Sequence, residues 1–128
     1  MGFDVHFVGE ISCPPIKEED LIILGSGSGT TKSLIVMGEK AKGVGARIAT
    51  VTMFPEHTIG QMADVIVTVP GSTLKKAEGE KNLAESVQPM GNLFEQMSWL
   101  VYDSTIMVLM DELHQTSEEM MGRHTNLE

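Results

Sequence analysis

A buried strand that runs directly into a glycine- and serine-rich turn is the feature that most constrains this chain. Residues 21–24 read Leu-Ile-Ile-Leu, and the turn at residues 25–31 reads GSGSGTT. A continuous apolar run of this length is typical of a strand buried on both faces of a parallel sheet. A helix is predicted over about residues 31–42, with Gly43 and Gly45 at its end. This order predicts an α/β fold with backbone N–H groups exposed where the helix begins.

The rest of the chain alternates strands with helices. A short strand is predicted at residues 5–8, two further buried strands at residues 47–53 and 65–69, and a short helix at residues 58–63. Alternation of this kind forms parallel βαβ units, in which ligands bind at the carboxyl ends of the strands. Residues 72–87 mix charged and small residues and are predicted to form an exposed loop.

A long helix is predicted from Pro89, since proline is common in the first turn of a helix. Apolar residues cover nearly all of its faces: Met90, Leu93, Phe94, Met97, Trp99, Leu100, Tyr102, Ile106, Leu109 and Met110. A helix that is apolar all round is buried on several sides. One small domain has little room to bury it, so we expect a homo-oligomer. A short amphipathic segment with Met120 and Met121 follows.

Length and charge narrow the class of protein. The 128 residues fit a single domain, residues 1–128. A formal net charge of −9 argues against nucleic acid and anionic membranes as partners. No stretch approaches the about 20 apolar residues of a membrane span. The single cysteine, Cys13, has no partner for an internal disulfide, so we expect a cytoplasmic location.

The turn has the chemistry of a phosphate site. Ser26, Ser28 and Thr31 supply three hydroxyls, and the glycines let the backbone come close, which suits an acidic protein without a basic patch. The structural alternative is a tight turn with a serine N-cap. A P-loop would place lysine directly after Gly29, where Thr30 stands. A dinucleotide site would place an acid at the end of the next strand, and none occurs there, so nucleotide binding is the weaker interpretation.

Several runs of sequence resemble the sugar isomerase (SIS) domain family, and within it the 6-phospho-3-hexuloisomerases. In chain order they are LIILGSGSGTTKSL, IGQMADVIVTVPGS, QPMGNLFEQ and RHTNLE. The resemblance implies that Ser26, Gly27, Ser28 and Thr31 bind the phosphate of a phosphosugar. The family turn usually reads SGSGET, so Thr30 replaces a glutamate. That change leaves the phosphate ligands in place and could alter the geometry of the turn.

The resemblance also implies a fold, namely a three-layer αβα, flavodoxin-like parallel sheet that is truncated at its N-terminus. Family members normally carry a helix, a strand and a glycine-rich loop with an arginine upstream. That strand would lie between residues 5–8 and residues 21–24, so both segments lose a partner. Either they pair directly, another subunit fills the gap, or the sequence is a fragment or has a misplaced start. We expect weak or no turnover from these 128 residues alone.

The implied reaction interconverts 3-hexulose 6-phosphate and fructose 6-phosphate through an enediol. It requires a base and a carrier for the hydroxyl proton, and we expect neither a metal nor another cofactor. Glu95 resembles the base, and partial burial would raise its pKa; the alternative is an acid favoured only by the helix dipole. His124 matches the family histidine that shuttles a proton, against the alternative of a solvated tail residue. We predict that His57 and His114 are surface residues.

Two classes of function remain. The first is the isomerase, acting beside a hexulose-phosphate synthase in the ribulose monophosphate pathway of formaldehyde assimilation, with a tetramer favoured by the resemblance. The second is a non-catalytic phosphosugar sensor, because SIS domains also occur in regulators. Glu95 and the RHTNLE run favour the enzyme. A basic patch or helix-turn-helix segment is lacking in the sequence, which weakens the regulator.

Overall fold

The computed structural model describes residues 1–76 and 78–127. The chain separates into two compact units. One is Pro15–Trp99, and the other combines Met1–Pro14 with the chain from Leu100 onward. The single domain expected over residues 1–128 therefore stays a prediction.

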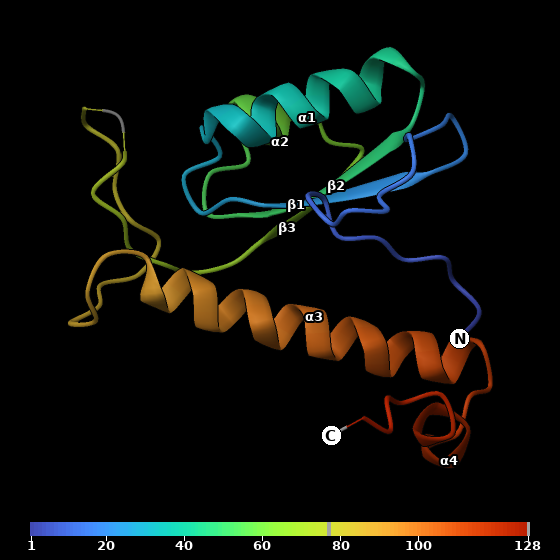
Figure 1. The fold of residues 1–128 in the computed structure, drawn as a ribbon. Coiled ribbons are helices and arrows are strands. Elements are labelled where there is room, and N and C mark those ends of the chain that lie inside the picture. The colour runs from blue at the N-terminus through green and yellow to red at the C-terminus, as the bar shows by residue number, and fades with distance from the viewer. Residues whose placement is uncertain (77, 128) are drawn as a thin grey trace. The chain divides into compact units, whose positions relative to one another are not determined.

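The unit Pro15–Trp99 holds a three-stranded parallel sheet, which confirms the α/β class. Strands β1 (Leu21–Gly25), β2 (Arg47–Thr52) and β3 (Val65–Thr68) lie in the order β1-β2-β3. Helices α1 (Lys32–Gly43) and α2 (Thr58–Met62) follow the first two strands, as predicted. Figure 1 shows both helices on one face of the sheet.

The core lies between that face of the sheet and the two helices. Leu24 of β1 pairs in register with Thr50 of β2, whose buried hydroxyl donates to the Leu24 carbonyl at 2.7 Å. This bond satisfies the polar group inside the core. The buried apolar side chains around it are Leu24, Ala41, Ala46, Ile48 and Ile59.

The opposite face of the sheet differs from the prediction. Leu21 and Ile23 of β1 are 56% and 58% exposed, and Val65 of β3 is 55% exposed. Burial on both faces was expected for all three strands, and this is wrong for β1 and β3 in the single chain. The physical reason is that α1 and α2 cover one face only.

Residues 5–8 do not form the predicted strand. Val5 and Phe7 are 81% and 80% exposed. A turn follows, in which the Glu10 N–H donates to the Phe7 carbonyl. Among the described residues, the sheet contains only β1, β2 and β3, so direct pairing with β1 is wrong. A strand needs a hydrogen-bonded neighbour, and this segment has none in the sheet. His6, which lies in the segment predicted as a strand, hydrogen-bonds to Glu10 beside solvent.

The predicted loop and the long helix are both present. Residues 72–76 and 78–87 contain neither helix nor strand, and Ala77 lies outside the described residues. Helix α3 (Asn92–Glu112) begins three residues after Pro89. Its burial on several sides is not observed in the single chain, where Ser98 is its only buried residue among those described.

A short helix follows α3. Helix α4 (Ser117–Met121) begins with a capping box between Thr116 and Glu119, which accounts for a helix this short. In the part of the chain that the structure describes, no helix combines the length and the apolar character needed to cross a bilayer.

Candidate phosphate-binding site

The hydroxyls of the turn lie close together between β1 and α1. Ser26 Oγ and Thr31 Oγ1 are 3.0 Å apart. Ser28 Oγ accepts two hydrogen bonds from Thr30, one from its hydroxyl at 3.2 Å and one from its backbone N–H at 3.4 Å. Ser26 and Ser28 are 4% and 8% exposed, whereas Thr31 faces solvent. The structure therefore brings together the predicted hydroxyls of Ser26 and Thr31, and it pairs the predicted hydroxyl of Ser28 with that of Thr30.

Capping does not account for these hydroxyls. The N-cap of α1 is Thr31, and its side chain makes no capping hydrogen bond. Its hydroxyl lies against Ser26 Oγ instead. The first turn of α1 also contains no acidic residue, so the positive end of the helix dipole is available to an anion.

Backbone hydrogen bonds fix the turn to the end of β2. The Ser26 N–H donates to the Val51 carbonyl at 3.0 Å, and the Met53 N–H donates to the Gly27 carbonyl at 3.2 Å. Gly29 has φ +64°, a conformation that favours glycine. The turn is therefore held by the sheet before any ligand binds.

Glu95 lies in the first turn of α3, next to a residue that packs on the phosphate turn. Phe94 contacts Gly27, and the Glu95 N–H donates to the Gly91 carbonyl at 3.1 Å. The Glu95 side chain is exposed in the single chain, so its expected partial burial is wrong there. Its role as a base stays a prediction.

His124 belongs to the other compact unit. Its side chain is exposed, and Nδ1 lies 3.1 Å from the Thr125 carbonyl oxygen. Glu128, the last residue of the RHTNLE run, lies outside the described residues. The proton-shuttle role of His124 stays a prediction. His114 is exposed, as expected.

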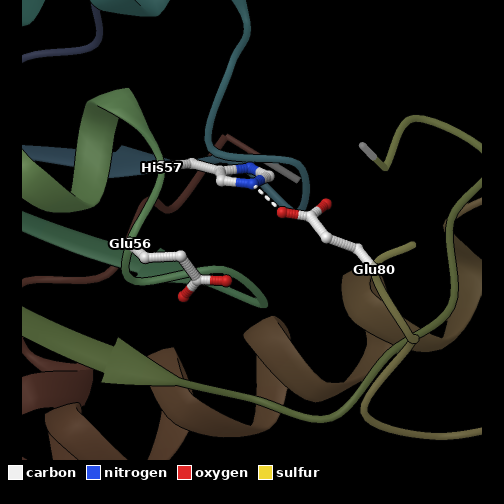
Figure 2. Close-up of side chains that lie close together, drawn as sticks. All are labelled: Glu56, His57 and Glu80. Carbon is white, nitrogen blue, oxygen red and sulfur yellow. Dashed lines mark hydrogen bonds and ion pairs between the residues drawn. The ribbon is translucent and has the colours of Figure 1, made fainter. Parts of the chain in front are cut away.

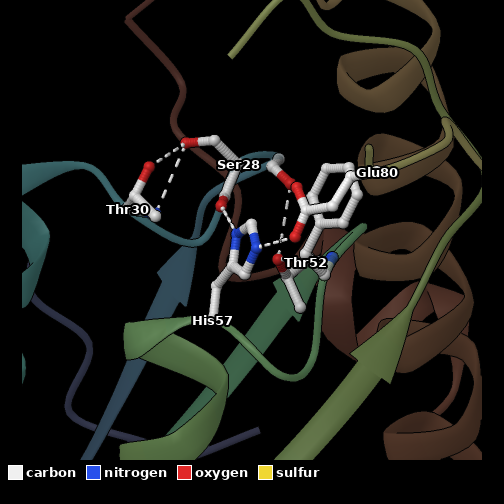
Figure 3. Close-up of polar contacts among 7 residues, drawn as sticks. Ser28, Thr30, Thr52, His57 and Glu80 are labelled. Carbon is white, nitrogen blue, oxygen red and sulfur yellow. Dashed lines mark hydrogen bonds and ion pairs between the residues drawn. The ribbon is translucent and has the colours of Figure 1, made fainter. Parts of the chain in front are cut away.

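His57 is not the surface residue that we predicted. Its side chain is 15% exposed and stacks on Phe54, with ring centroids 4.9 Å apart. Nδ1 lies 2.7 Å from the Ser28 carbonyl oxygen, and Nε2 lies 2.5 Å from Glu80 Oε1. Figure 3 marks both contacts with dashed lines. The Ser28 carbonyl is the largest cause of a raised His57 pKa, Glu80 and Glu56 add to it, and burial opposes it. The turn thus has an ionisable neighbour.

Glu56, His57 and Glu80 form the one group of possible metal ligands among the described residues. One ligand atom from each lies within 4.8 Å of the others. Figure 2 shows the three side chains and the contact between His57 and Glu80. Nε2 of His57 already hydrogen-bonds to Glu80, and Glu56 is exposed. The group is therefore an ionic cluster beside the turn. A cleft of about 260 Å³ adjoins it, between the end of β2 and the loop around Glu80.

Sequence reasoning missed three residues of the candidate site, each for a different reason: Thr30, His57 and Glu80. His57 follows the carboxyl end of β2, where ligand sites gather in parallel sheets, so its position was an available signal. Glu80 comes from a long loop, whose path no periodic pattern predicts. Thr30 was considered only as a replacement for glutamate.

Known proteins of similar sequence and structure identify the family. The SIS domain family matches residues 5–110. A Bacillus subtilis protein named 3-hexulose-6-phosphate isomerase is 48% identical over 128 residues, which are 100% of this chain and 68% of that protein. The Mycobacterium gastri protein of the same name is 35% identical over 127 residues, 99% of this chain and 62% of that protein.

A solved structure agrees with these relatives. It is a hypothetical protein of Methanococcus jannaschii, whose crystal structure is described as inferring a molecular function of 3-hexulose-6-phosphate isomerase. It is 31% identical with a TM-score of 0.80, and the match covers 99% of this chain and 65% of that one. This chain thus spans about two thirds of the length of its relatives. The chain belongs to the SIS domain family and, within it, to the family of the 3-hexulose-6-phosphate isomerases.

Proposed function

We propose that this chain is a 3-hexulose-6-phosphate isomerase, which interconverts 3-hexulose 6-phosphate and fructose 6-phosphate. The observation that carries the proposal is the hydroxyl-lined turn at the N-terminus of α1, in a chain 48% identical to a protein of that name. The hydroxyls of Ser26 and Ser28 are held in place before substrate arrives. A phosphosugar would be held by its phosphate, since backbone N–H groups, hydroxyls and the helix dipole all favour an anion there.

A phosphate that binds in this turn would replace hydrogen bonds that the hydroxyls already make with one another. Ser26, Thr31 and Ser28 bond to partners inside the turn. The hydroxyls of Ser26 and Ser28 can rotate their protons toward a phosphate oxygen, because their oxygens still accept from the N–H groups of Gly29 and Thr30. The turn therefore pre-positions the donors, which reduces the entropy lost on binding.

The reaction moves a carbonyl between two neighbouring carbons of the same sugar. In our proposal Glu95 removes the proton from the carbon next to the carbonyl, which gives an enediol, and returns it to the neighbouring carbon. His124 carries the hydroxyl proton. The sugar as a whole is neither oxidised nor reduced, so proton transfers alone balance the reaction. Support for Glu95 comes from its place beside Phe94, whose ring contacts the turn.

We further propose that the enzyme assembles as a homo-oligomer, with a tetramer as the expected form. Support comes from α3, whose apolar residues Trp99 and Met107 are 68% and 70% exposed in the single chain. Large exposed apolar patches mark interaction surfaces. Cytoplasmic location and action beside a hexulose-phosphate synthase in the ribulose monophosphate pathway complete the proposal.

Conversion of fructose 6-phosphate, followed by ¹³C NMR, tests the proposed activity. We expect a new 3-hexulose 6-phosphate signal, at a rate below the ~10 per second typical of enzymes, and no conversion of glucose 6-phosphate. Ser26→Ala and Ser28→Ala should both weaken binding. Binding of fructose 6-phosphate without any conversion would favour the sensor, and no binding at all would contradict both functions.

A further inference from the structure

His57 joins the phosphate turn to the loop around Glu80. Its Nδ1 lies 2.7 Å from the Ser28 carbonyl oxygen and its Nε2 lies 2.5 Å from Glu80 Oε1. A carbonyl oxygen can only accept a hydrogen bond, so Nδ1 carries a proton. Nε2 faces the Glu80 carboxylate, which in its ionised form can only accept, so the bond there places a second proton on the ring. The arrangement in Figure 3 is therefore that of an imidazolium with both N–H groups donating.

The contact with the turn extends beyond one hydrogen bond. A Cβ on Gly29 would lie 2.9 Å from the Cβ of His57, so the two backbones are already close. Two residues further along, the Ile59 N–H donates to the Gly29 carbonyl at 3.0 Å. The ring is also supported by Phe54, with planes 17° apart. The path of the turn at Ser28 and Gly29 thus depends on His57.

Ser28 is the residue through which this contact would act on a ligand. Its carbonyl accepts from His57, while its Oγ accepts from the Thr30 N–H and hydroxyl on the other side. Ser28 is 8% exposed, which leaves it little room to reorient. Fixing the carbonyl fixes the peptide from which the hydroxyl projects.

Charge adds to this mechanical role. Residues 25–31 include no basic residue, in a chain of net charge −9. The His57 imidazolium places a cation behind Ser28, and its acidic neighbours Glu80 and Glu56 favour the charged ring. The imidazolium offsets the carboxylates of Glu80 and Glu56, which would otherwise repel an anion on the turn.

We propose that His57, in its protonated form, is a positioning residue for phosphosugar binding, which holds Ser28 in its phosphate-binding geometry and ties the Glu80 loop to the turn. The proposal rests on the proposed function, since it assumes that the turn binds phosphate. His57 acts through Ser28 and does not handle the reacting carbons. Its loss should therefore raise KM and the Kd of ligands, while kcat changes little.

The test compares the full chain with its variants His57→Ala, His57→Asn and Glu80→Gln, with the exposed His114→Ala as a matched control. Titration calorimetry measures the Kd of fructose 6-phosphate and of inorganic phosphate from pH 6 to pH 9, and kinetics give KM and kcat. We expect His57→Ala to raise Kd and KM about tenfold, with kcat within about twofold, because a charge-assisted hydrogen bond is lost. His57→Asn keeps an N–H donor near the Nδ1 position and should recover part of the affinity.

The pH dependence of ligand affinity distinguishes this positioning role of His57 from a merely structural one. In the natural chain, affinity should fall as the pH rises through the raised His57 pKa. The asparagine of His57→Asn does not titrate. Any change in the ligand affinity of this variant over the pH range therefore comes from the phosphate group itself, whose second pKa is about 6. In Glu80→Gln the loss of affinity should occur at lower pH, because the negative charge next to His57 that raises its pKa is gone.

Each outcome decides between the roles. A lower melting temperature in His57→Ala with unchanged Kd and an unchanged pH profile would overturn the proposal, as would a loss of kcat at constant KM. If the natural chain binds phosphosugar and His57→Ala binds it equally well, only this inference fails. If the natural chain binds neither fructose 6-phosphate nor phosphate, the proposed function fails, and this inference fails with it.

Discussion

Phe94 lies directly against Gly27, so the first turn of α3 packs on the phosphate turn. A Cβ built on Gly27 would be 3.0 Å from two carbons of the Phe94 ring and 3.1 Å from the Met53 methyl group. Any side chain at residue 27 would have to displace one of them. The contact connects the turn that we propose to hold phosphate with the helix that carries Glu95.

Gly27→Ala should destabilise the chain and weaken ligand binding. The added methyl group overpacks a filled space, which typically costs about 1–3 kcal/mol of unfolding free energy. Gly43→Ala is the matched control, because a Cβ there meets nothing within 4 Å. It should stabilise the chain by about 0.4–1 kcal/mol. Urea denaturation measures both, and equal effects of the two substitutions would contradict the packing described for Gly27.

Thr31→Ala should separate ligand binding from helix capping. The Thr31 side chain makes no capping hydrogen bond. Its loss should change the unfolding free energy by less than about 0.5 kcal/mol, while the Kd of fructose 6-phosphate rises about tenfold. Thr116→Ala is the control, since Thr116 caps α4 and its loss should cost about 1 kcal/mol of helix stability. A Thr31→Ala variant with unchanged Kd would remove Thr31 from the phosphate ligands.

Stability should depend on pH through His57. Its pKa is raised in the folded chain, so its contribution is complete below the unfolded value of about 6.5 and is lost as pH rises through the folded value. The difference in unfolding free energy between the natural chain and His57→Asn should therefore shrink from pH 6 to pH 9. Urea denaturation at both pH values measures it. A difference that grows with pH would show that the imidazolium is not stabilised by folding.

The apolar surface of α3 should mediate self-association. We expect light scattering after gel filtration to give a mass above the 13.9 kDa of one chain. Met107→Glu should reduce that mass, because it places a charge on an exposed apolar residue. Ser104→Glu adds the same charge at an exposed polar residue of the same helix and should have less effect. A monomeric natural chain would refute the assembly.

Local patterns predicted those elements that depend on local sequence. A short-range physical cause underlies the apolar run of β1, the glycines around the end of α1 and the residues of the turn. The structure confirms the strand–turn–helix unit. The same local reasoning was wrong at residues 5–8. A strand forms only with a hydrogen-bonded neighbour, and the pattern of a segment does not show whether that neighbour is present.

The candidate site was predictable only in part for a similar reason. Its hydroxyls are neighbours in sequence, so their meeting follows from one turn. His57 and Glu80 reach that turn from 29 and 52 positions beyond Ser28, through tertiary packing. The exposure of Glu95 depends on what covers the start of α3, which periodicity does not report.

Deuterium exchange into fructose 6-phosphate tests the central claim most directly. In deuterated water the proposed base removes the C3 proton and the enediol recovers deuterium from solvent, so mass spectrometry or NMR detects label at C3. We predict exchange in the natural chain and in Glu112→Gln, a control on the same helix. Glu95→Gln should slow it by about 10²–10⁴-fold, the usual contribution of a general base. Exchange at an undiminished rate in Glu95→Gln would contradict the account.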